Sequence, residues 1–228
     1  MELNAEVILP EDISIGKFSK DIAREIIEKF EKSLIYKIID REIPLSNDED
    51  RSKVYQIALK NASKESGEIL SEIYYNRRLA LIEESVKKYF SENDHMILEG
   101  FVNFRLKAYM EELKTLCINA MEEFSAQREY EEFIDMLRFF VSVQSPREEV
   151  VNVVKKGEGM RILNKRRKDI TDLYMDELVN REEELTKEDI ILSELITIAP
   201  QRIVIHDDKN AEKIYETISQ IFKDVTYV

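Results

Sequence analysis

Cysteine and histidine are scarce in this chain of 228 residues, which contains one Cys and two His. A single cysteine excludes a framework of intrachain disulfides and fits a reducing compartment. Because Cys117 is flanked by Leu116 and Ile118, we expect it to be buried and unreactive. No CxxC or HExxH spacing occurs either, so the sequence predicts no metal site and no cofactor.

Long apolar runs are also absent. No stretch approaches the roughly 18 consecutive apolar residues of a transmembrane helix, and the acidic start MELNAEVILPED lacks the basic region of a secretory signal. These absences predict a soluble cytoplasmic protein without a transmembrane segment. The chain also lacks a linker rich in Gly, Ser or Pro, so we expect its parts to pack as one body.

Glycine and proline are few, at five and four residues, whereas 43% of the residues are hydrophobic and 36% are charged. This composition is typical of a helix-rich globular protein and not of a disordered one. The formal net charge of -13 argues against a general nucleic-acid binder, because nonspecific affinity for nucleic acids comes from positive charge. A local basic patch can still override that charge.

The hydrophobic pattern of residues 1–145 predicts an antiparallel helical bundle whose one strand is Glu6–Leu9. Ser19 is the expected N-cap of a helix through Asp40, and Ser46 with Glu49 forms a capping box for the next helix. We expect a kink or break near Gly67 and a loop at residues 91–94.

The stretch from Ile97 to Gln144 has the longest helical pattern. The apolar spacing restarts after Gln127, which predicts two helices. In the second helix, Met136 and Phe139 widen the apolar stripe until most sides are apolar. We therefore expect that helix to be deeply buried.

The period of the hydrophobic pattern changes after Pro146. The pattern of residues 146–228 predicts a small sheet of three or four strands covered by helices. Two β-rich runs surround a Gly-containing turn, and the Thr186 and Asp189 pair opens a later helix. The expected elements are a hairpin from Val150–Val154 and Met160–Leu163, helices at Asp172–Asn180 and Lys187–Thr197, strand Arg202–His206, a helix from Lys209, and an edge strand Val225–Val228. The fold class is thus α+β and mostly helical.

Three blocks of sequence resemble the YtxC-like sporulation protein family of endospore-forming Firmicutes. They are EGFVNFRLK at residues 99–107, EYEEFI at 129–134 leading to LRFFV at 137–141, and ITIAPQRIVIH at 196–206. The resemblance implies a role in sporulation. It supplies no biochemical activity and no catalytic residues.

Arg105 borders the apolar stripe of its predicted helix, three residues after Val102 and four before Tyr109. We expect its guanidinium to be buried and paired with Glu112 or Asp135, which would pin two helices together. The alternative is an arginine that binds an anion or a partner.

Two further groups of residues are candidate binding sites. His206 ends a strand of the predicted sheet, a position where ligands often bind, and Arg202 begins the same strand. The only concentrated basic run is Lys165, Arg166, Arg167 and Lys168, in the turn after the hairpin. Capping and packing for His206, and a solvated turn for the basic run, are the structural alternatives.

The stretch from Ile97 to Gln144 contains no nucleophile with a base and no phosphate-binding loop, and we recognise no catalytic constellation in the sequence. We therefore expect a non-enzymatic protein that binds another protein during sporulation. An RNA- or DNA-binding accessory that uses residues 165–168 is the first alternative. An enzyme or ligand-binding protein with a site near His206 is the second. The sequence leaves homo-oligomerisation open.

Overall fold

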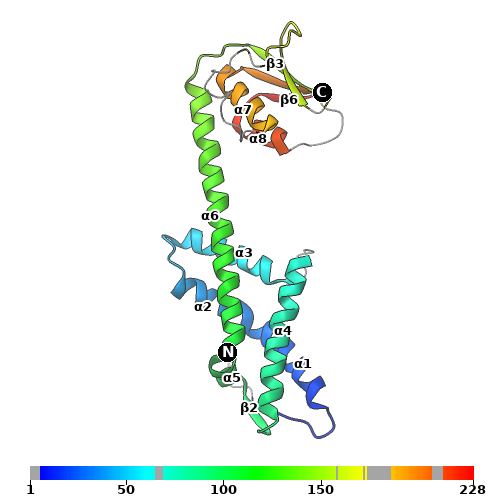
Figure 1. Cartoon of the computed structure of the whole chain (residues 1–228). Coiled ribbons are helices and arrows are strands. Elements are labelled where there is room, and N and C mark those ends of the chain that lie inside the picture. Colours follow the sequence, from blue (N-terminus) through cyan, green and yellow to red (C-terminus); the bar gives the residue numbers. More distant parts are fainter. Residues whose placement is uncertain (1–5, 65–68, 158, 172, 174–185, 207–212) are drawn as a thin grey trace. The chain divides into compact units, whose positions relative to one another are not determined.

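The computed structural model describes residues 6–64, 69–157, 159–171, 173, 186–206 and 213–228 (Figure 1). The fold is α+β and mostly helical, as the sequence predicts. The chain divides into two compact units, Met1–Gln127 (unit 1) and Arg128–Val228 (unit 2). The division lies inside a helix, upstream of the change of period at Pro146. The predicted helix at Asp172–Asn180 lies almost entirely outside the described residues.

Unit 1 consists of packed helices and one pair of short strands. α1 packs along α4, α2 packs on α3, and α3 packs on α4 (Figure 1). The elements are β1 (Glu6–Ile8), α1 (Ile15–Ile26), the π-helical turn η1 (Ile27–Glu31), α2 (Lys32–Glu42), α3 (Asp48–Ala62), α4 (Ile69–Phe90), β2 (His95–Ile97), α5 (Leu98–Arg105) and the first part of α6 (Lys107–Val143).

The predicted N-cap at Ser19 is wrong. α1 begins earlier, and the Ser14 side chain accepts a hydrogen bond from the backbone N–H of Lys17. Ser19 lies inside the helix, fully buried, and its hydroxyl donates to the carbonyl of Ile15 at 2.7 Å. The apolar stripe of this helix starts at Phe18, one residue before the predicted cap, which is why the helix needs an earlier start.

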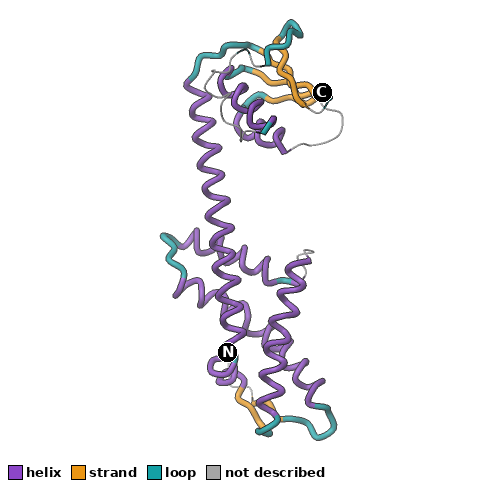
Figure 2. The backbone as a smooth tube through the Cα atoms, viewed as in Figure 1, coloured by secondary structure: helices purple, strands orange, loops and turns teal. Residues whose placement is uncertain are grey.

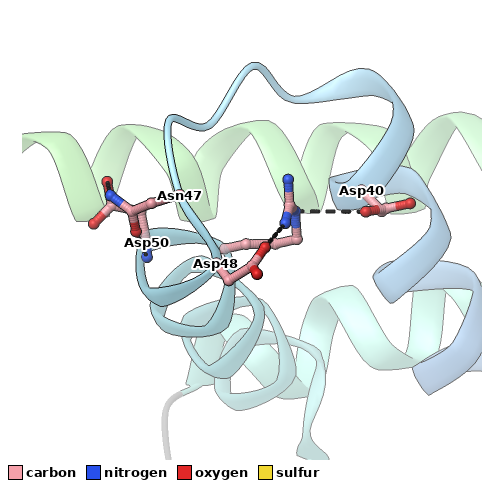
Figure 3. Close-up of polar contacts among 5 residues, drawn as sticks. Asp40, Asn47, Asp48 and Asp50 are labelled. Atoms are coloured by element: carbon pink, nitrogen blue, oxygen red, sulfur yellow. Dashed lines mark hydrogen bonds and ion pairs between the residues drawn. The ribbon is translucent and has the colours of Figure 1, made fainter.

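The capping box expected at Ser46 and Glu49 is displaced by one residue. Asn47 caps α3 by accepting a hydrogen bond from the N–H of Asp50 at 2.8 Å, and its amide donates to the Asp50 carboxylate at 3.0 Å. Figure 3 shows Asn47 and Asp50 at the start of α3, and its dashed lines mark contacts of the same helix with Asp48 and Asp40. Arg51 of α3 pairs with Asp48 and, at 3.5 Å, with Asp40, so α3 is tied to the end of α2.

The sequence shows no strand signal between Leu9 and Gln144, yet β2 pairs with β1 in an antiparallel ladder, with Val7 opposite Met96. A strand of three residues is too short to show an alternating pattern. Its partner lies about ninety residues upstream, so no local signal reveals it.

The break predicted after Gln127 is also wrong. The helical stretch is interrupted at Leu106, whose backbone leaves the helical region at φ -95° and ψ 44°. α6 then runs without interruption from Lys107 to Val143. The change of hydrophobic spacing at Gln127 therefore marks the passage of one helix from unit 1 into unit 2.

Unit 2 contains a four-stranded mixed sheet of order β4-β3-β5-β6. β3 pairs with β4 antiparallel and with β5 parallel, and β5 pairs with β6 parallel. The predicted hairpin is confirmed, with Gly157 at φ 64° in its turn, and so is the capping box of Thr186 and Asp189. The elements are the end of α6, β3 (Val150–Lys156), β4 (Gly159–Asn164), α7 (Lys187–Ile198), β5 (Arg202–His206), α8 (Lys213–Ile221) and β6 (Val225–Tyr227).

One face of this sheet forms the core of unit 2. Val151 and Val153 of β3 and Ile203 and Ile205 of β5 are fully buried, in one cluster with residues of α7 and α8. Figure 2 shows the strands of this sheet beside its helices. The end of α6 adds Ile134, with Leu137 and Val141 packed beside it. The helices therefore cover one sheet face.

The deep burial predicted for the second half of the central stretch is wrong. Ile134 is buried at 4% exposure, but the apolar side chains on the other side of α6 are 49% to 68% exposed, namely Phe133, Met136, Phe139, Phe140 and Val143. A helix that is apolar on most sides buries only the side that meets the sheet. Among the helices described here, none has a stretch long and apolar enough to span a bilayer.

Candidate functional site

The second face of the sheet carries two polar side chains, Asn152 and His206. Side chains alternate along a strand, so Asn152 and Val154 of β3 point away from the buried face. The parallel register places Val204 beside Asn152 and His206 beside Val154 on β5. Residues of three elements thus meet at this face: Asn152 of β3, His206 at the end of β5, and the turn that follows β4.

Asn152 fixes the orientation of His206. Its side-chain oxygen lies 2.8 Å from Nε2 of His206, and its amide nitrogen donates to the carbonyl of Asn164 at 3.4 Å. Because an amide oxygen can only accept, Nε2 of His206 carries the proton of this hydrogen bond. Asn152 is only 7% exposed, so its side chain is fixed by the residues packed around it.

Arg167 approaches the same ring nitrogen. Its Nη1 lies 3.5 Å from Nε2 of His206, a nitrogen whose proton is already directed at Asn152. Burial lowers the pKa of His206, and the positive charge of Arg167 lowers it further. The imidazole is therefore held in its neutral form beside a cation.

The basic turn is held rigidly by Asn164. The side-chain oxygen of Asn164 accepts hydrogen bonds from the N–H groups of Arg166 and Lys168 at 3.0 and 3.1 Å. Its backbone bonds to the carbonyl of Lys168 and to the N–H of Arg167, both at 2.9 Å. Arg167 adopts a left-handed conformation with φ 62°.

Two of the predicted binding residues are already paired with acids. Lys165 forms an exposed ion pair with Glu149 at 2.9 Å, and Arg202 forms one with Asp224 at 3.0 Å. The structure thus brings Arg167 and His206 together. It engages Lys165 and Arg202 in separate ion pairs.

The buried ion pair predicted for Arg105 is wrong. Arg105 is exposed at the end of α5 and forms no ion pair with the described residues. Glu112 pairs with Arg77 at 2.7 Å instead, and Asp135 pairs with Arg138 at 2.6 Å. Arg105 lines a surface pocket of about 290 Å³ together with Ser85, Lys88, Tyr89, Glu92, Asn93 and Phe101.

A different arginine holds the helices of unit 1. Arg78 of α4 is 1% exposed, and its Nε and Nη2 donate to the two oxygens of Glu31 at 3.0 and 3.1 Å. Nη2 also donates to the carbonyl of Ala62, the last residue of α3, at 2.7 Å. This planar, two-pronged contact is the geometry that a guanidinium favours. Arg78 therefore connects η1, α3 and α4.

Tyr109 of α6 completes the network, because its hydroxyl donates to Oε2 of Glu31 at 2.9 Å. Burial raises the pKa of Tyr109, and the negative charge of Glu31 raises it further. The tyrosine is therefore a permanent donor. Together, Arg78 and Tyr109 place three hydrogen bonds on one buried carboxylate.

A cavity of about 220 Å³ lies beside this network in unit 1. Its walls carry both amides and carboxylates, which gives no preference for an anion. The lining residues are Asn61, Ser71, Tyr74, Arg78, Glu112, Thr115, Leu116, Asn119 and Glu123.

The described residues include neither a reactive thiol nor a cluster of metal ligands. Cys117 is fully buried, and burial raises the pKa of its thiol to about 12, so it stays protonated. Among the described residues, no three His, Cys, Asp or Glu side chains converge as metal ligands.

Two features of the sequence could have revealed the residues that the prediction missed. Arg78 precedes Ile82, Val86 and Phe90 at steps of four on α4, so a charged residue interrupts an apolar stripe. Asn152 likewise interrupts a run of valines in β3. A polar residue inside such a pattern needs a buried partner.

Fold and sites together define a mostly helical α+β protein in which one long helix is shared by a helical unit and a helix-covered mixed sheet. The chain matches the model of the YtxC-like family over residues 17–225, and it belongs to that family. It is similar to the "Uncharacterized protein YtxC" of Bacillus subtilis (strain 168), with 23% identity over 216 residues that cover 92% of this chain and 75% of that protein. No solved structure matches the chain.

Proposed function

We propose that the protein is a non-enzymatic interaction module of the sporulation programme, which binds a partner protein through the exposed apolar face of α6. We define this α6 apolar face as Phe133, Met136, Phe139, Phe140 and Val143. The sporulation context is inferred from the family resemblance. The proposal of partner binding rests on the α6 apolar face.

The spacing of the α6 apolar face suits a partner helix. Phe133, Met136, Phe140 and Val143 follow one another at steps of three, four and three, which aligns them in one stripe, with Phe139 at its edge. Aromatic residues and methionine are enriched in protein interfaces. If each side chain exposes roughly 100 Å², the face presents on the order of 500 Å², the size of a functional patch.

The charges around the face favour a basic partner. Glu129 and Glu132 lie on the same side of α6, at the end of the face nearest Phe133. Glu132 pairs with Arg128 at 3.1 Å, whereas Glu129 forms no ion pair with the described residues. A partner helix with an apolar stripe and a Lys or Arg opposite Glu129 would complement this surface.

A second copy of the chain is a poorer occupant. Parallel pairing of two α6 helices would place Glu129 and Glu132 against the same two acids. Antiparallel pairing that sets Phe133 opposite Val143 would place Glu132 opposite Gln144 and Glu129 opposite Arg147, which lies beyond the last residue of α6. Neither arrangement therefore places a cation of α6 opposite Glu129.

The test is a crosslinking pull-down from sporulating cells with a zero-length carboxyl-to-amine reagent. The bait is the full chain, compared with the variant Phe133→Gln, Met136→Gln, Phe140→Gln. A matched control carries Phe104→Gln and Ile118→Gln, which replace exposed apolar residues of unit 1. We expect a partner joined through a lysine to Glu129 or Glu132, retained by the control and lost by the variant.

Purified components must then reproduce the result. Charge reversal by Glu129→Lys and Glu132→Lys should weaken binding of the purified partner about tenfold or more. Capture of the same proteins by the Gln variant would overturn the proposal. So would light scattering that shows a dimer of this chain dissociated by the same variant, because the occupant would then be a second copy.

A further inference from the structure

Positive charge is concentrated in one segment of an acidic chain. Between Val150 and Lys168 the sequence contains seven Lys or Arg residues and a single acid, Glu158, whereas the whole chain has a net charge of -13. The segment forms the β3–β4 hairpin and the turn after it.

Among the residues that the structure describes, three cations of the turn have no compensating acid. Arg166, Arg167 and Lys168 form no ion pair with the described residues, in contrast to Lys165, which pairs with Glu149. The adjacent acid, Asp169, accepts a hydrogen bond from the N–H of Thr171 at 3.0 Å. Hydrogen bonds from Thr171 are also the main cause of the lowered pKa of Asp169.

The backbone conformation of Arg167 is costly for a residue with a side chain. A left-handed backbone at φ 62° costs a residue with a side chain on the order of 1 kcal/mol, and Gly or Asn would reduce that cost. The resulting turn holds the guanidinium 3.5 Å from a ring nitrogen that Asn152 already engages. Arg167 therefore keeps its donors available at the sheet face.

We propose that Arg167, together with Arg166 and Lys168, binds the phosphate group of a phosphate ester beside His206. A guanidinium matches two phosphate oxygens with two parallel N–H groups, and the neighbouring cations balance the second negative charge. The ester is either part of a nucleic-acid backbone or a small phosphorylated molecule. This site is independent of the α6 apolar face.

Calorimetry with pyrophosphate tests the shared chemistry on the full chain. The variant Arg167→Gly removes the guanidinium and suits the left-handed backbone, so the turn should keep its shape. The matched control is Arg202→Ala, which removes one exposed arginine from the same unit. We expect Arg167→Gly to weaken binding about tenfold or more and Arg202→Ala to change it less than about threefold.

A second variant guards against a change in the turn itself. Asn152→Asp puts a carboxylate at the oxygen that contacts His206, beside Arg167. This internal acid should replace the phosphate and abolish binding. Because the variant also loses the 3.4 Å hydrogen bond from Asn152 to the carbonyl of Asn164, an unchanged thermal melt is required of it. Pyrophosphate binding that survives both Arg167→Gly and Asn152→Asp would overturn the proposal.

Competition identifies the source of the phosphate. A fluorescent single-stranded oligonucleotide that pyrophosphate displaces, and whose affinity falls steeply with salt, indicates a nucleic-acid backbone. Pyrophosphate binding without oligonucleotide binding indicates a small phosphate ester. Failure to bind either probe would refute the site but leave the pull-down of the partner protein unaffected.

His206 provides a direct spectroscopic signal. The chain has only two histidines, so His95 in β2 of unit 1 is an internal reference for the imidazole protons in NMR. A bound phosphate should offset the charge of Arg167, the cation beside His206, and raise the pKa of His206. Saturating pyrophosphate that leaves the titration of His206 unchanged would place the anion elsewhere.

Discussion

Arg78 of unit 1 and Arg167 of unit 2 have opposite environments. In unit 1, Arg78 is buried and gives its hydrogen bonds to Glu31 and to the end of α3. In unit 2, Arg167 lies beside a neutral histidine, has no acid partner among the described residues, and sits in a costly backbone conformation. One arginine completes a network inside the fold, and the other keeps its charge available.

Whether the charge of an arginine is compensated inside the protein distinguishes a structural arginine from a binding one. Its position in the sequence does not. Both residues lie in basic doublets or runs, Arg77–Arg78 and Lys165–Lys168. A buried cation must find acceptors when the protein folds, because its desolvation is otherwise too costly. An uncompensated cation at a rigid surface can find them in a ligand.

The largest effect is expected at Arg78. Arg78→Met leaves the carboxylate of Glu31 buried without its counter-ion, which should lower the unfolding free energy of unit 1 by about 3–5 kcal/mol. Urea unfolding measures the loss. The double variant Glu31→Gln, Arg78→Met should cost less than the sum of its single variants, because the uncompensated charge is gone. Additive losses would show that the two groups are not coupled.

The two sides of α6 should respond differently to the same substitution. Ile134→Gln, on the side packed against the sheet, should destabilise unit 2 by at least about 2 kcal/mol. Phe133→Gln, Met136→Gln and Phe140→Gln together should change stability by less than about 1 kcal/mol, since their side chains are already exposed. Thermal melts distinguish the two sides, and equal losses would contradict the exposure of the α6 apolar face.

Tyr109→Phe probes the weaker part of the Arg78 network. The substitution removes one hydrogen bond from the buried carboxylate of Glu31 and keeps the ring. We expect a loss of about 1–3 kcal/mol in urea unfolding of unit 1. Tyr36→Phe is the control, because Tyr36 is half-exposed in the same unit. Equal effects of the two variants would mean that the hydroxyl of Tyr109 adds no stability.

His206 should make the stability of unit 2 sensitive to acid. Its pKa in the folded protein is below the ordinary value of 6.5, so the folded state disfavours the proton. The stability that His206 contributes is therefore present above about pH 6.5 and is lost as the pH falls through the lowered pKa. Urea midpoints measured downward from pH 7 should fall less for His206→Gln than for the natural chain. Parallel profiles would contradict the neutral state of His206.

The smallest effect on stability is expected at Arg167. Arg167→Gly relieves a left-handed conformation, so the unfolding free energy of unit 2 should stay constant or rise by less than about 1 kcal/mol. Arg166→Ala provides a comparison at a neighbouring position of the turn. A loss of several kcal/mol in Arg167→Gly would assign a structural role to the guanidinium.

Three elements of unit 2 could be predicted because their signals are local. The hairpin needs only the valine-rich run of β3 and the apolar residues of Met160–Leu163 on either side of the turn at Gly157, and α7 begins at the capping box of Thr186 and Asp189. β5 follows directly from its apolar run after Pro200. Each of these elements is encoded within a dozen residues.

What failed depended on distant contacts. β2 exists because β1 lies beside it, and Arg78 is buried because Glu31, forty-seven positions upstream, can accept its hydrogen bonds. The apolar pattern of residues 130–143 predicts burial but cannot say which side of the helix is covered. Arg167 and His206 were both candidates from the sequence. Only the structure shows that Arg167 and Asn152 both approach Nε2 of His206.

Hydrogen exchange followed by mass spectrometry, on Arg78→Met and Arg167→Gly with and without pyrophosphate, tests the contrast between the two arginines most directly. We predict faster exchange throughout the helices of unit 1 in Arg78→Met, regardless of pyrophosphate. Arg167→Gly should exchange like the natural chain without pyrophosphate, and it should lack the protection that pyrophosphate gives to residues 164–168 and to β5. Faster exchange throughout unit 2 in Arg167→Gly, or unchanged exchange of unit 1 in Arg78→Met, would contradict the account.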